Sequence, residues 1–206
     1  ALAETKIPII ISTGMADKSD LDNGLNAINK YHSNITILHC LSQYPSDYKE
    51  LNLKSITYLK NNYPNYTIGY SDHSIGIVTP VAAVAMGAEV IEKHITIDRN
   101  MKGTDQEGSL ASDGIRRMLR DIRNLELSFG EEGIFRSDAV VSAQTKLERS
   151  IATNKTLPKG HIIKEEDLHM LSPGDGLKWH EKDQIIGKAT SSDIATNEIL
   201  YPKFVV

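Results

Sequence analysis

Four short segments rich in β-branched residues recur along the first 130 residues, and each is followed by apolar residues at helical spacing. The segments run from Ile7 to Ser12, Ile35 to Cys40, Tyr66 to Tyr70 and Glu89 to Thr96. Strand and helix that alternate at a period of roughly 25 to 30 residues are typical of βα units with a parallel sheet. The α/β pattern alone leaves two architectures open: half of a (β/α)8 TIM-type barrel, or an open doubly wound sheet.

The last of the four helical patterns is the clearest. Its apolar face consists of Ile115, Met118, Leu119, Ile122, Leu125 and Phe129. Ser112 is the predicted N-cap and Gly130 the predicted stop. The preceding pattern, Val81 to Met86, is small and apolar throughout and is predicted to end at Gly87.

The pattern of apolar and polar residues changes after Gly130. Residues 131–149 lack periodicity and are predicted to be a linker between a first domain at 1–130 and a second at 150–206. The second domain carries turn signals at short intervals between short apolar pieces and holds the only tryptophan, Trp179. This pattern predicts a small, mostly β module.

Composition and charge exclude several classes of partner. The chain has 206 residues, with 27 acidic against 23 basic ones and no block of Lys or Arg, so neither nucleic acid nor a membrane surface is an expected partner. No apolar run approaches the ~20 residues of a membrane span, and no signal segment opens the chain, so we expect a cytoplasmic protein. The single cysteine, Cys40, fits a reducing compartment, and since its neighbour His39 points to the opposite face of a strand, Cys40 is interpreted as a packing residue.

Two histidines stand at the ends of successive predicted strands, His73 after the third and His94 in the fourth. Parallel strands joined by a helix present their C-terminal ends at one rim, so the two imidazoles are predicted to meet there. Spacing alone fits a metal site and a pair of ordinary polar strand ends about equally. The polar residues beside each histidine favour the metal site, and by the two-residue period of a strand Glu92, not Lys93, faces it with His94.

A set of short strings then appears in a fixed order. They are Ile11-Ser12-Thr13-Gly14-Met15, His39-Cys40, Tyr44-Pro45, Gly69-Tyr70-Ser71-Asp72-His73, Glu92-Lys93-His94, Gly103-Thr104-Asp105 and Ser109-Leu110. In order and spacing they resemble the C-terminal half of the barrel of the sialic acid synthase family. The tail is similar to the antifreeze-like (SAF) domain of those enzymes, through Lys159-Gly160, Glu166-Asp167-Leu168, Pro173-Gly174-Asp175-Gly176 and Ile186-Gly187-Lys188.

The resemblance implies a reaction and a binding site. Enzymes of this family condense phosphoenolpyruvate with an N-acylated hexosamine, such as N-acetylmannosamine, to a nonulosonic acid and phosphate. His73 and His94 match the residues that hold a divalent metal, Mn²⁺ or Mg²⁺. Ser12 and Ser71 match serines that bind phosphoenolpyruvate, and Ser42 replaces a substrate-contacting asparagine of some members.

The resemblance also implies catalytic residues and a partner. Asp105 matches an aspartate that positions the sugar or relays a proton, and Glu92 is expected to assist the metal or its ligand. Gln106 stands where many members have histidine, and Ser172 where an arginine often reaches the partner subunit's site. Both differences point to an acceptor other than N-acetylmannosamine, for example one leading to legionaminic-type or pseudaminic-type acids. A homodimer is implied as well.

The first four strands of the family's barrel have no counterpart in this chain. We therefore expect the 206-residue chain by itself to lack full synthase activity. The other half of the barrel is expected from a longer gene product or from another chain. The competing hypothesis is a non-catalytic carbohydrate-binding or assembly module derived from the same family.

Overall fold

The computed structural model covers residues 1–206, and the chain divides into two units, Ala1–Glu131 and Glu132–Val206. The first unit is built on a four-stranded parallel sheet with the strands in sequential order. The strands are β1 (Ile9–Ser12), β2 (Ile35–Cys40), β3 (Thr67–Asp72) and β4 (Val90–Lys93). Each strand pairs with the next one along the chain, as in a barrel, whereas a doubly wound sheet reverses its strand order part-way.

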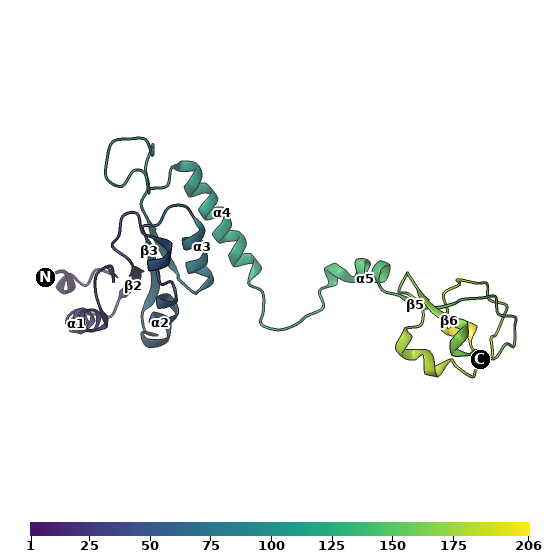
Figure 1. Cartoon of the computed structure of the whole chain (residues 1–206). Helices are drawn as coiled ribbons and strands as arrows, with labels where there is room; N and C mark the ends of the chain where they lie inside the picture. Colours follow the sequence, from purple (N-terminus) through teal and green to yellow (C-terminus); the bar gives the residue numbers. More distant parts are fainter. The chain divides into compact units, whose positions relative to one another are not determined.

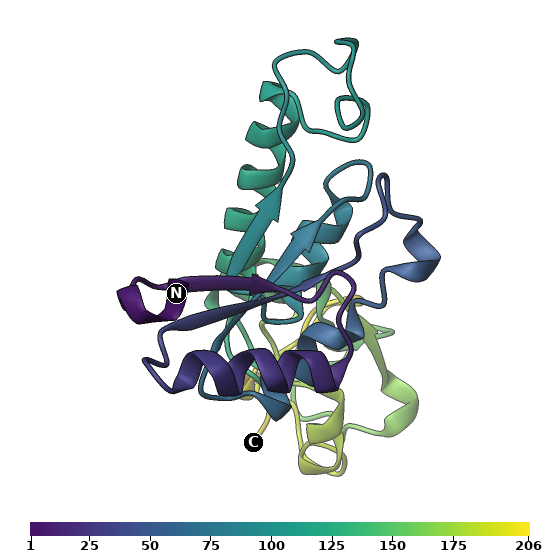
Figure 2. The ribbon, with the colours of Figure 1, turned by 90° about the vertical axis from the view of Figure 1, so that its left-hand side faces the viewer.

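Four helices follow the strands and cover one face of the sheet (Figures 1 and 2). They are α1 (Lys18–Asn29), α2 (Lys54–Asn62), α3 (Val78–Ala85) and α4 (Ser112–Ser128). Short 3-10 helices lie at Leu2–Thr5 and Tyr48–Glu50. The helix stops at Gly87 and Gly130 were predicted correctly, since both glycines adopt positive φ just beyond a helix end. The predicted cap was wrong by one residue: α4 begins at Ser112, and Ala111 is the N-cap.

The two faces of the sheet differ in chemistry. The face toward the helices carries the core, with Ile35, Ile37, Ile68 and Tyr70 packed against Leu21, Leu25, Ile56 and Leu59. The opposite face is the inner face of the half-barrel. There the 60% exposed Ile10 of β1 stands next to Ser12 by two-residue alternation, and Leu38, Gly69 and Val90 line up on the neighbouring strands.

The second unit is small and mostly irregular. Its strands β5 (Ser150–Thr153) and β6 (Leu168–Leu171) pair antiparallel, and 3-10 helices lie at Asp138–Val140, Glu165–Asp167, Trp179–Gln184 and Pro202–Phe204. Isolated bridges join the remaining loops into a β-rich fold. The core consists of Ile151, Leu157, Ile163, Leu168, Ile185, Ile194 and Leu200.

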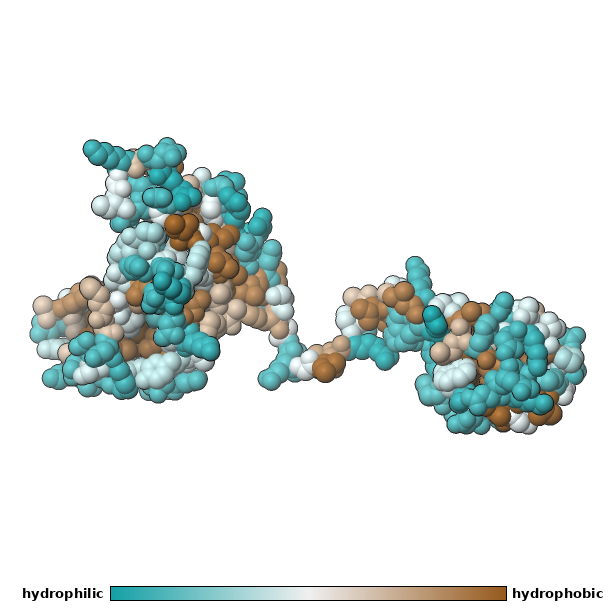
Figure 3. Space-filling view, in the orientation of Figure 1, coloured by the Kyte–Doolittle hydropathy of each residue, from teal (hydrophilic) through white to brown (hydrophobic).

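The segment predicted to be a linker contains a helix that the pattern did not predict. Helix α5 (Val141–Leu147) has no buried residue, so its sequence shows no apolar face at helical spacing from which it could be predicted. It is tied to the tail by a hydrogen bond from the amide of Gly174 to Thr145 O (2.7 Å) and by an ion pair between Lys178 and Glu148 (2.6 Å). Hydrophobic residues are visible on the surface of α5 (Figure 3). Ile134, in the stretch before α5, is fully exposed. None of the chain's helices combines the length and the apolar character needed to span a membrane.

Candidate functional site

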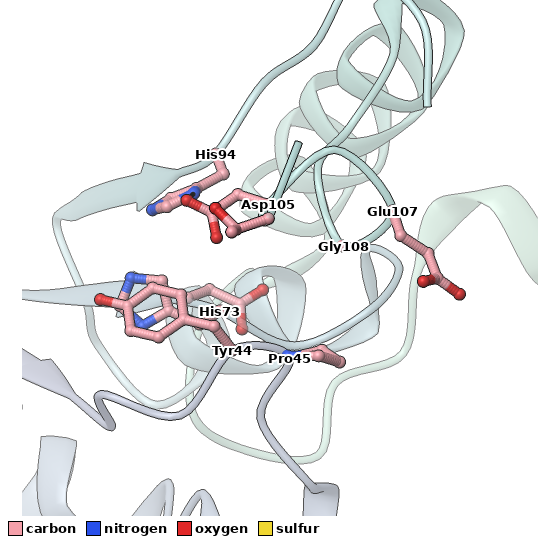
Figure 4. A pocket seen from close by; sticks show the side chains of 9 residues that line it. Tyr44, Pro45, His73, His94, Asp105, Glu107 and Gly108 are labelled. Atoms are coloured by element: carbon pink, nitrogen blue, oxygen red, sulfur yellow. Dashed lines mark ion pairs between the residues drawn. The ribbon is translucent and has the colours of Figure 1, made fainter. Parts of the chain in front are cut away.

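His73 and His94 lie side by side at the carboxyl end of the sheet. His73 directly follows β3 and His94 directly follows β4, and these two strands are neighbours. The ring centroids are 5.0 Å apart and the ring planes are nearly perpendicular, at 86°. The ring of Tyr44 lies 4.1 Å from that of His73 and 5.6 Å from that of His94 (Figure 4). The predicted meeting of the two imidazoles at one rim is therefore present in the structure.

The hydrogen bonding of His73 fixes which nitrogen is available to a ligand. His73 Nδ1 lies 2.9 Å from the carbonyl oxygen of Leu41. A carbonyl can only accept, so Nδ1 carries the proton and donates it. Nε2 then keeps a free lone pair, and the backbone contact holds the ring in the way that outer hydrogen bonds hold metal-binding histidines.

A small pocket opens beside the two imidazoles. It is lined by Tyr44, Pro45, Asp72, His73, His94, Thr104, Asp105, Glu107 and Gly108. Asp105 Oδ2 lies 3.6 Å from His94 Nδ1, which is longer than a hydrogen bond and makes this an electrostatic contact. In Figure 4 the side chain of Asp105 lies beside His94, while the carboxylate of Glu107 points away from both histidines.

Gln106 does not belong to this lining. Its amide oxygen accepts a hydrogen bond from the hydroxyl of Thr96, and its side chain lies over Gly103. Gln106 therefore acts on the shape of the loop and not on the contents of the pocket.

A second polar group lies on the inner face of the half-barrel, at the ends of β2, β3 and β4. Ser71 Oγ donates a hydrogen bond to Glu92 Oε1 (2.6 Å), across a register pair of β3 and β4. Lys93 turns to the opposite face and pairs with Asp72. Glu92 thus shares the inner face with Ser71 and lies on the other side of the sheet from Lys93, but it does not belong to the lining of the pocket beside His73 and His94.

Ser12 and Ser42 complete the set of predicted binding hydroxyls. Ser12 ends β1, in register with Leu38. The amide of Ser42 donates to the carbonyl of Gly14 (3.1 Å), and a Cβ added at Gly14 would lie 2.1 Å from Ser42 Oγ. The absence of a side chain at Gly14 thus leaves the space that the Ser42 hydroxyl occupies.

Cys40 also belongs to this group, although the sequence indicated only a packing role. Its Sγ lies 3.8 Å from His73 Nδ1, and the residue is paired in register with Ser71. Burial raises the pKa of the Cys40 thiol, against smaller opposing effects of Ser71 and Ser42. The signal was present in the alternation itself, because the step that separates Cys40 from His39 also places Cys40 on the inner face.

The chain matches the model of the NeuB family over residues 1–133 and that of the SAF domain over residues 148–206. The chain belongs to the NeuB family. The resemblance seen in the ordered strings, and with it the half-barrel followed by an antifreeze-like domain, is confirmed.

Relatives of this NeuB family chain are synthases of several nonulosonic acids. The chain is 35% identical to the N,N'-diacetyllegionaminic acid synthase of Legionella pneumophila over 203 residues, which is 96% of this chain and 57% of the relative. It is 35% identical to a pseudaminic acid synthase of Campylobacter jejuni, covering 97% of this chain and 58% of the relative. It is 28% identical to the N-acetylneuraminate-9-phosphate synthase of Homo sapiens, covering 96% of this chain and 55% of the relative.

Solved structures show the same fold. The spore coat polysaccharide biosynthesis protein spsE of Bacillus subtilis matches with a TM-score of 0.60 and 28% identity, over 100% of this chain and 63% of that one. The N-acetylneuraminic acid synthetase of Leptospira borgpetersenii, solved in complex with citrate, matches with a TM-score of 0.62 and 34% identity, over 69% of this chain and 50% of that one. The NeuB family chain spans less than two thirds of the length of these relatives.

The donor set of the NeuB family chain suits an open metal site, not a closed one. No group of three or more His, Cys, Asp or Glu side chains is arranged to hold a metal ion. His73 and His94 offer two imidazoles at one pocket, with Asp105 next to His94. Two protein ligands would leave the remaining coordination positions of a divalent ion to water and substrate, whereas a closed structural site fills them with protein ligands.

Proposed function

We propose that the inner face of this half-barrel is one wall of an active site that condenses phosphoenolpyruvate with an N-acylated hexosamine, giving a nonulosonic acid and phosphate. The observation that carries the proposal is the pair of imidazoles, His73 and His94, 5.0 Å apart in a pocket that also holds Asp105. Relatives over nearly the whole chain are synthases of such acids, which supports the same class of reaction.

His73, through its free Nε2, and His94 would hold the divalent ion, Mn²⁺ or Mg²⁺. The bound ion would polarise the aldehyde of the acceptor sugar as a Lewis acid. Asp105, beside His94 and 45% exposed at its side chain, is placed to bind a sugar hydroxyl or to move a proton at it. These three residues thus form the acceptor side of the site.

Ser12, Ser42 and Ser71 would bind the phosphate and carboxylate of phosphoenolpyruvate by donating hydroxyl hydrogens to them. Glu92, which now accepts the hydrogen of Ser71, is the carboxylate closest to this group. As C3 of phosphoenolpyruvate bonds to the aldehyde carbon, whose oxygen takes up a proton, positive charge develops at C2. Glu92 would balance this charge and orient the water that adds to C2 and gives up a proton. Phosphate then leaves by cleavage of its C–O bond.

The acceptor is proposed to be a legionaminic-type or pseudaminic-type precursor. Synthases of both kinds match this chain at 35% identity, and Ser172 replaces a cation that would bind the sugar. A cytoplasmic homodimer in which the SAF domain covers the partner's site is proposed with it.

The experiment that tests this function adds the half of the barrel that this chain lacks. The first four βα units of the Legionella synthase are fused before Ala1, and phosphate release is measured with phosphoenolpyruvate, an N-acylated hexosamine and Mn²⁺. We expect turnover that needs all three, little turnover by the 206-residue chain alone, and loss of turnover in His73→Ala and His94→Ala. His32→Ala is the matched control, because His32 precedes β2 at the opposite end of the sheet. Turnover that survives both site substitutions contradicts the proposal, and a properly folded fusion without turnover favours a non-catalytic module.

A further inference from the structure

A buried ion pair lies directly behind the two histidines. Lys93 Nζ is 2.6 Å from Asp72 Oδ2, and the two side chains are 3% and 0% exposed. Asp72 and Lys93 are the last residues of β3 and β4 and face each other in register. The pair therefore links the two strands one residue before His73 and one residue before His94.

The carboxylate of Asp72 is fully used. It accepts hydrogen bonds from the hydroxyl of Tyr70 (3.0 Å), the amide of Ser74 (2.9 Å) and the hydroxyl of Thr79 (3.0 Å), besides the ammonium of Lys93. Four donors from different directions hold the carboxylate in one orientation.

The residues on both sides of His73 in the sequence, Asp72 and Ser74, belong to this network. Lys93 also donates to the carbonyl of Ser74, so both backbone groups of Ser74 are bound, the N–H to Asp72 and the C=O to Lys93. The carbonyl of His73 accepts from the amide of Ser46 (2.9 Å), and that of His94 from the amide of Leu110 (3.0 Å). The carbonyl of each histidine is thus bound, and Asp72–Lys93 links the two strand ends on one face of the sheet, as Ser71–Glu92 does on the other.

Stability alone does not explain a charge pair at this place. Removing two charges from water is costly, and apolar residues of similar volume often stabilise a fold as well or better. An ion pair has an effect that apolar packing lacks, since it fixes the relative position of two strand ends through directional bonds.

We infer that Asp72 and Lys93 are positioning residues that set the separation and orientation of His73 and His94 for binding one divalent ion. The inference rests on the proposed metal role of the two histidines. Loss of the pair would let the ends of β3 and β4 shift relative to each other, and two ligands that are misplaced hold an ion poorly. Outer residues that orient metal ligands typically change affinity by about 10-fold to 100-fold.

The test measures Mn²⁺ binding by the 206-residue chain, from the electron paramagnetic resonance signal of free Mn²⁺, together with the thermal midpoint from circular dichroism. The variants are Asp72→Asn, Lys93→Met and the double variant with both changes. Each single variant leaves a polar or charged group without its partner, so its midpoint falls, and its Mn²⁺ affinity falls about tenfold or more. The double variant has no unpaired buried charge and regains much of the midpoint, but its affinity stays low.

A core variant gives the control for lost stability. Ile56→Ala opens a cavity at a fully buried position of α2 and lowers the midpoint without touching the strand ends, so its Mn²⁺ affinity stays at the wild-type value. Wild-type affinity in the double variant, or affinity that follows the midpoint in all variants including Ile56→Ala, overturns the inference. If His73→Ala and His94→Ala also bind Mn²⁺ as the wild type does, the proposed metal site itself is wrong.

Discussion

Ser71 Oγ donates its hydrogen to Glu92 Oε1 at 2.6 Å, across the paired ends of β3 and β4. A serine hydroxyl has one hydrogen, so Ser71 cannot donate to Glu92 and to a substrate oxygen at the same time. If Ser71 binds phosphoenolpyruvate, the anion has to displace Glu92 from this hydrogen. The carboxylate of Glu92 thus competes with the substrate for Ser71.

Glu92→Gln is expected to separate binding from catalysis. Loss of one negative charge beside an anion site is worth about 1 kcal/mol, so phosphoenolpyruvate should bind about fivefold more tightly. Turnover should fall, because the neutral amide cannot balance positive charge in the transition state. KM and kcat for phosphoenolpyruvate, measured by phosphate release in the fusion protein, check both expectations. Weaker binding in Glu92→Gln would show that the carboxylate helps to hold the substrate.

Gly14→Ala is expected to weaken phosphoenolpyruvate binding through Ser42. The new Cβ would lie 2.1 Å from Ser42 Oγ and 3.2 Å from Cys40 Sγ, so the hydroxyl has to rotate away. Loss of one hydrogen bond to a charged group, about 1.5 to 3 kcal/mol, raises KM by about tenfold or more. Gly24→Ala is the control: its Cβ would meet only Ile11 Cδ1 at 3.6 Å, and alanine in α1 should stabilise the fold by about 0.5 to 1 kcal/mol. An unchanged KM in Gly14→Ala would remove Ser42 from the phosphoenolpyruvate site.

The alternation of strands and helices could be predicted from the spacing of β-branched and apolar residues, whereas the choice of a half-barrel over an open sheet came from the resemblance of the ordered strings. The two-residue alternation of β4 also placed Glu92 and Lys93 on opposite faces of the sheet, as they are in the structure. Helix α5 was missed because it buries no residue, so tertiary hydrogen bonds and not an apolar period hold it in place.

The orientation of loop side chains could not be predicted in the same way. Gln106 lies in residues 94–111, which carry no regular strand or helix, so nothing in the spacing shows that its side chain turns to Thr96. Cys40 is buried, as its interpretation as a packing residue expects. Its neighbours could not be predicted from spacing, because Ser42, Ser71 and His73, which surround its thiol, come from loops and a strand that meet only in the fold.

The stability of the second unit is expected to depend on Asp167 at low pH. Burial by itself would raise the pKa of this carboxyl, but hydrogen bonds from Lys155, His161 and the amide of Lys164 lower it from 3.8 to about 2. A lowered pKa stabilises the folded state above the unfolded value of 3.8, and the contribution is lost as the pH falls toward 2. We therefore expect unfolding of this unit by acid between these two values.

Trp179 reports this transition, because it is the only tryptophan and packs against the core of the second unit. Its fluorescence is followed in urea titrations at pH values from 7 to 2. In the wild type, the urea concentration at half-unfolding should decrease once the pH falls below about 4. Asp167→Asn should lower the free energy of unfolding at pH 7 by about 1 to 3 kcal/mol, and the urea midpoint with it. The urea midpoint of this variant should also depend less on pH. Glu166→Gln, at an exposed neighbour, should leave the curve unchanged. An acid transition that persists in Asp167→Asn would assign the effect to another group.

The acceptor side of the site is expected to depend on Asp105 much more than on Gln106. Asp105 lines the pocket beside His94, whereas Gln106 is turned to Thr96 and outside the lining. Asp105→Asn keeps the size of the side chain but can no longer take up a proton, and kcat should fall by about 10²-fold or more with KM for phosphoenolpyruvate unchanged. Gln106→Ala removes a contact within the loop, and KM for the hexosamine should change by no more than about twofold. Steady-state kinetics of the fusion with each substrate varied in turn checks both. A larger effect of Gln106→Ala than of Asp105→Asn on the hexosamine would mean that the loop rearranges when the sugar binds, bringing Gln106 into the pocket.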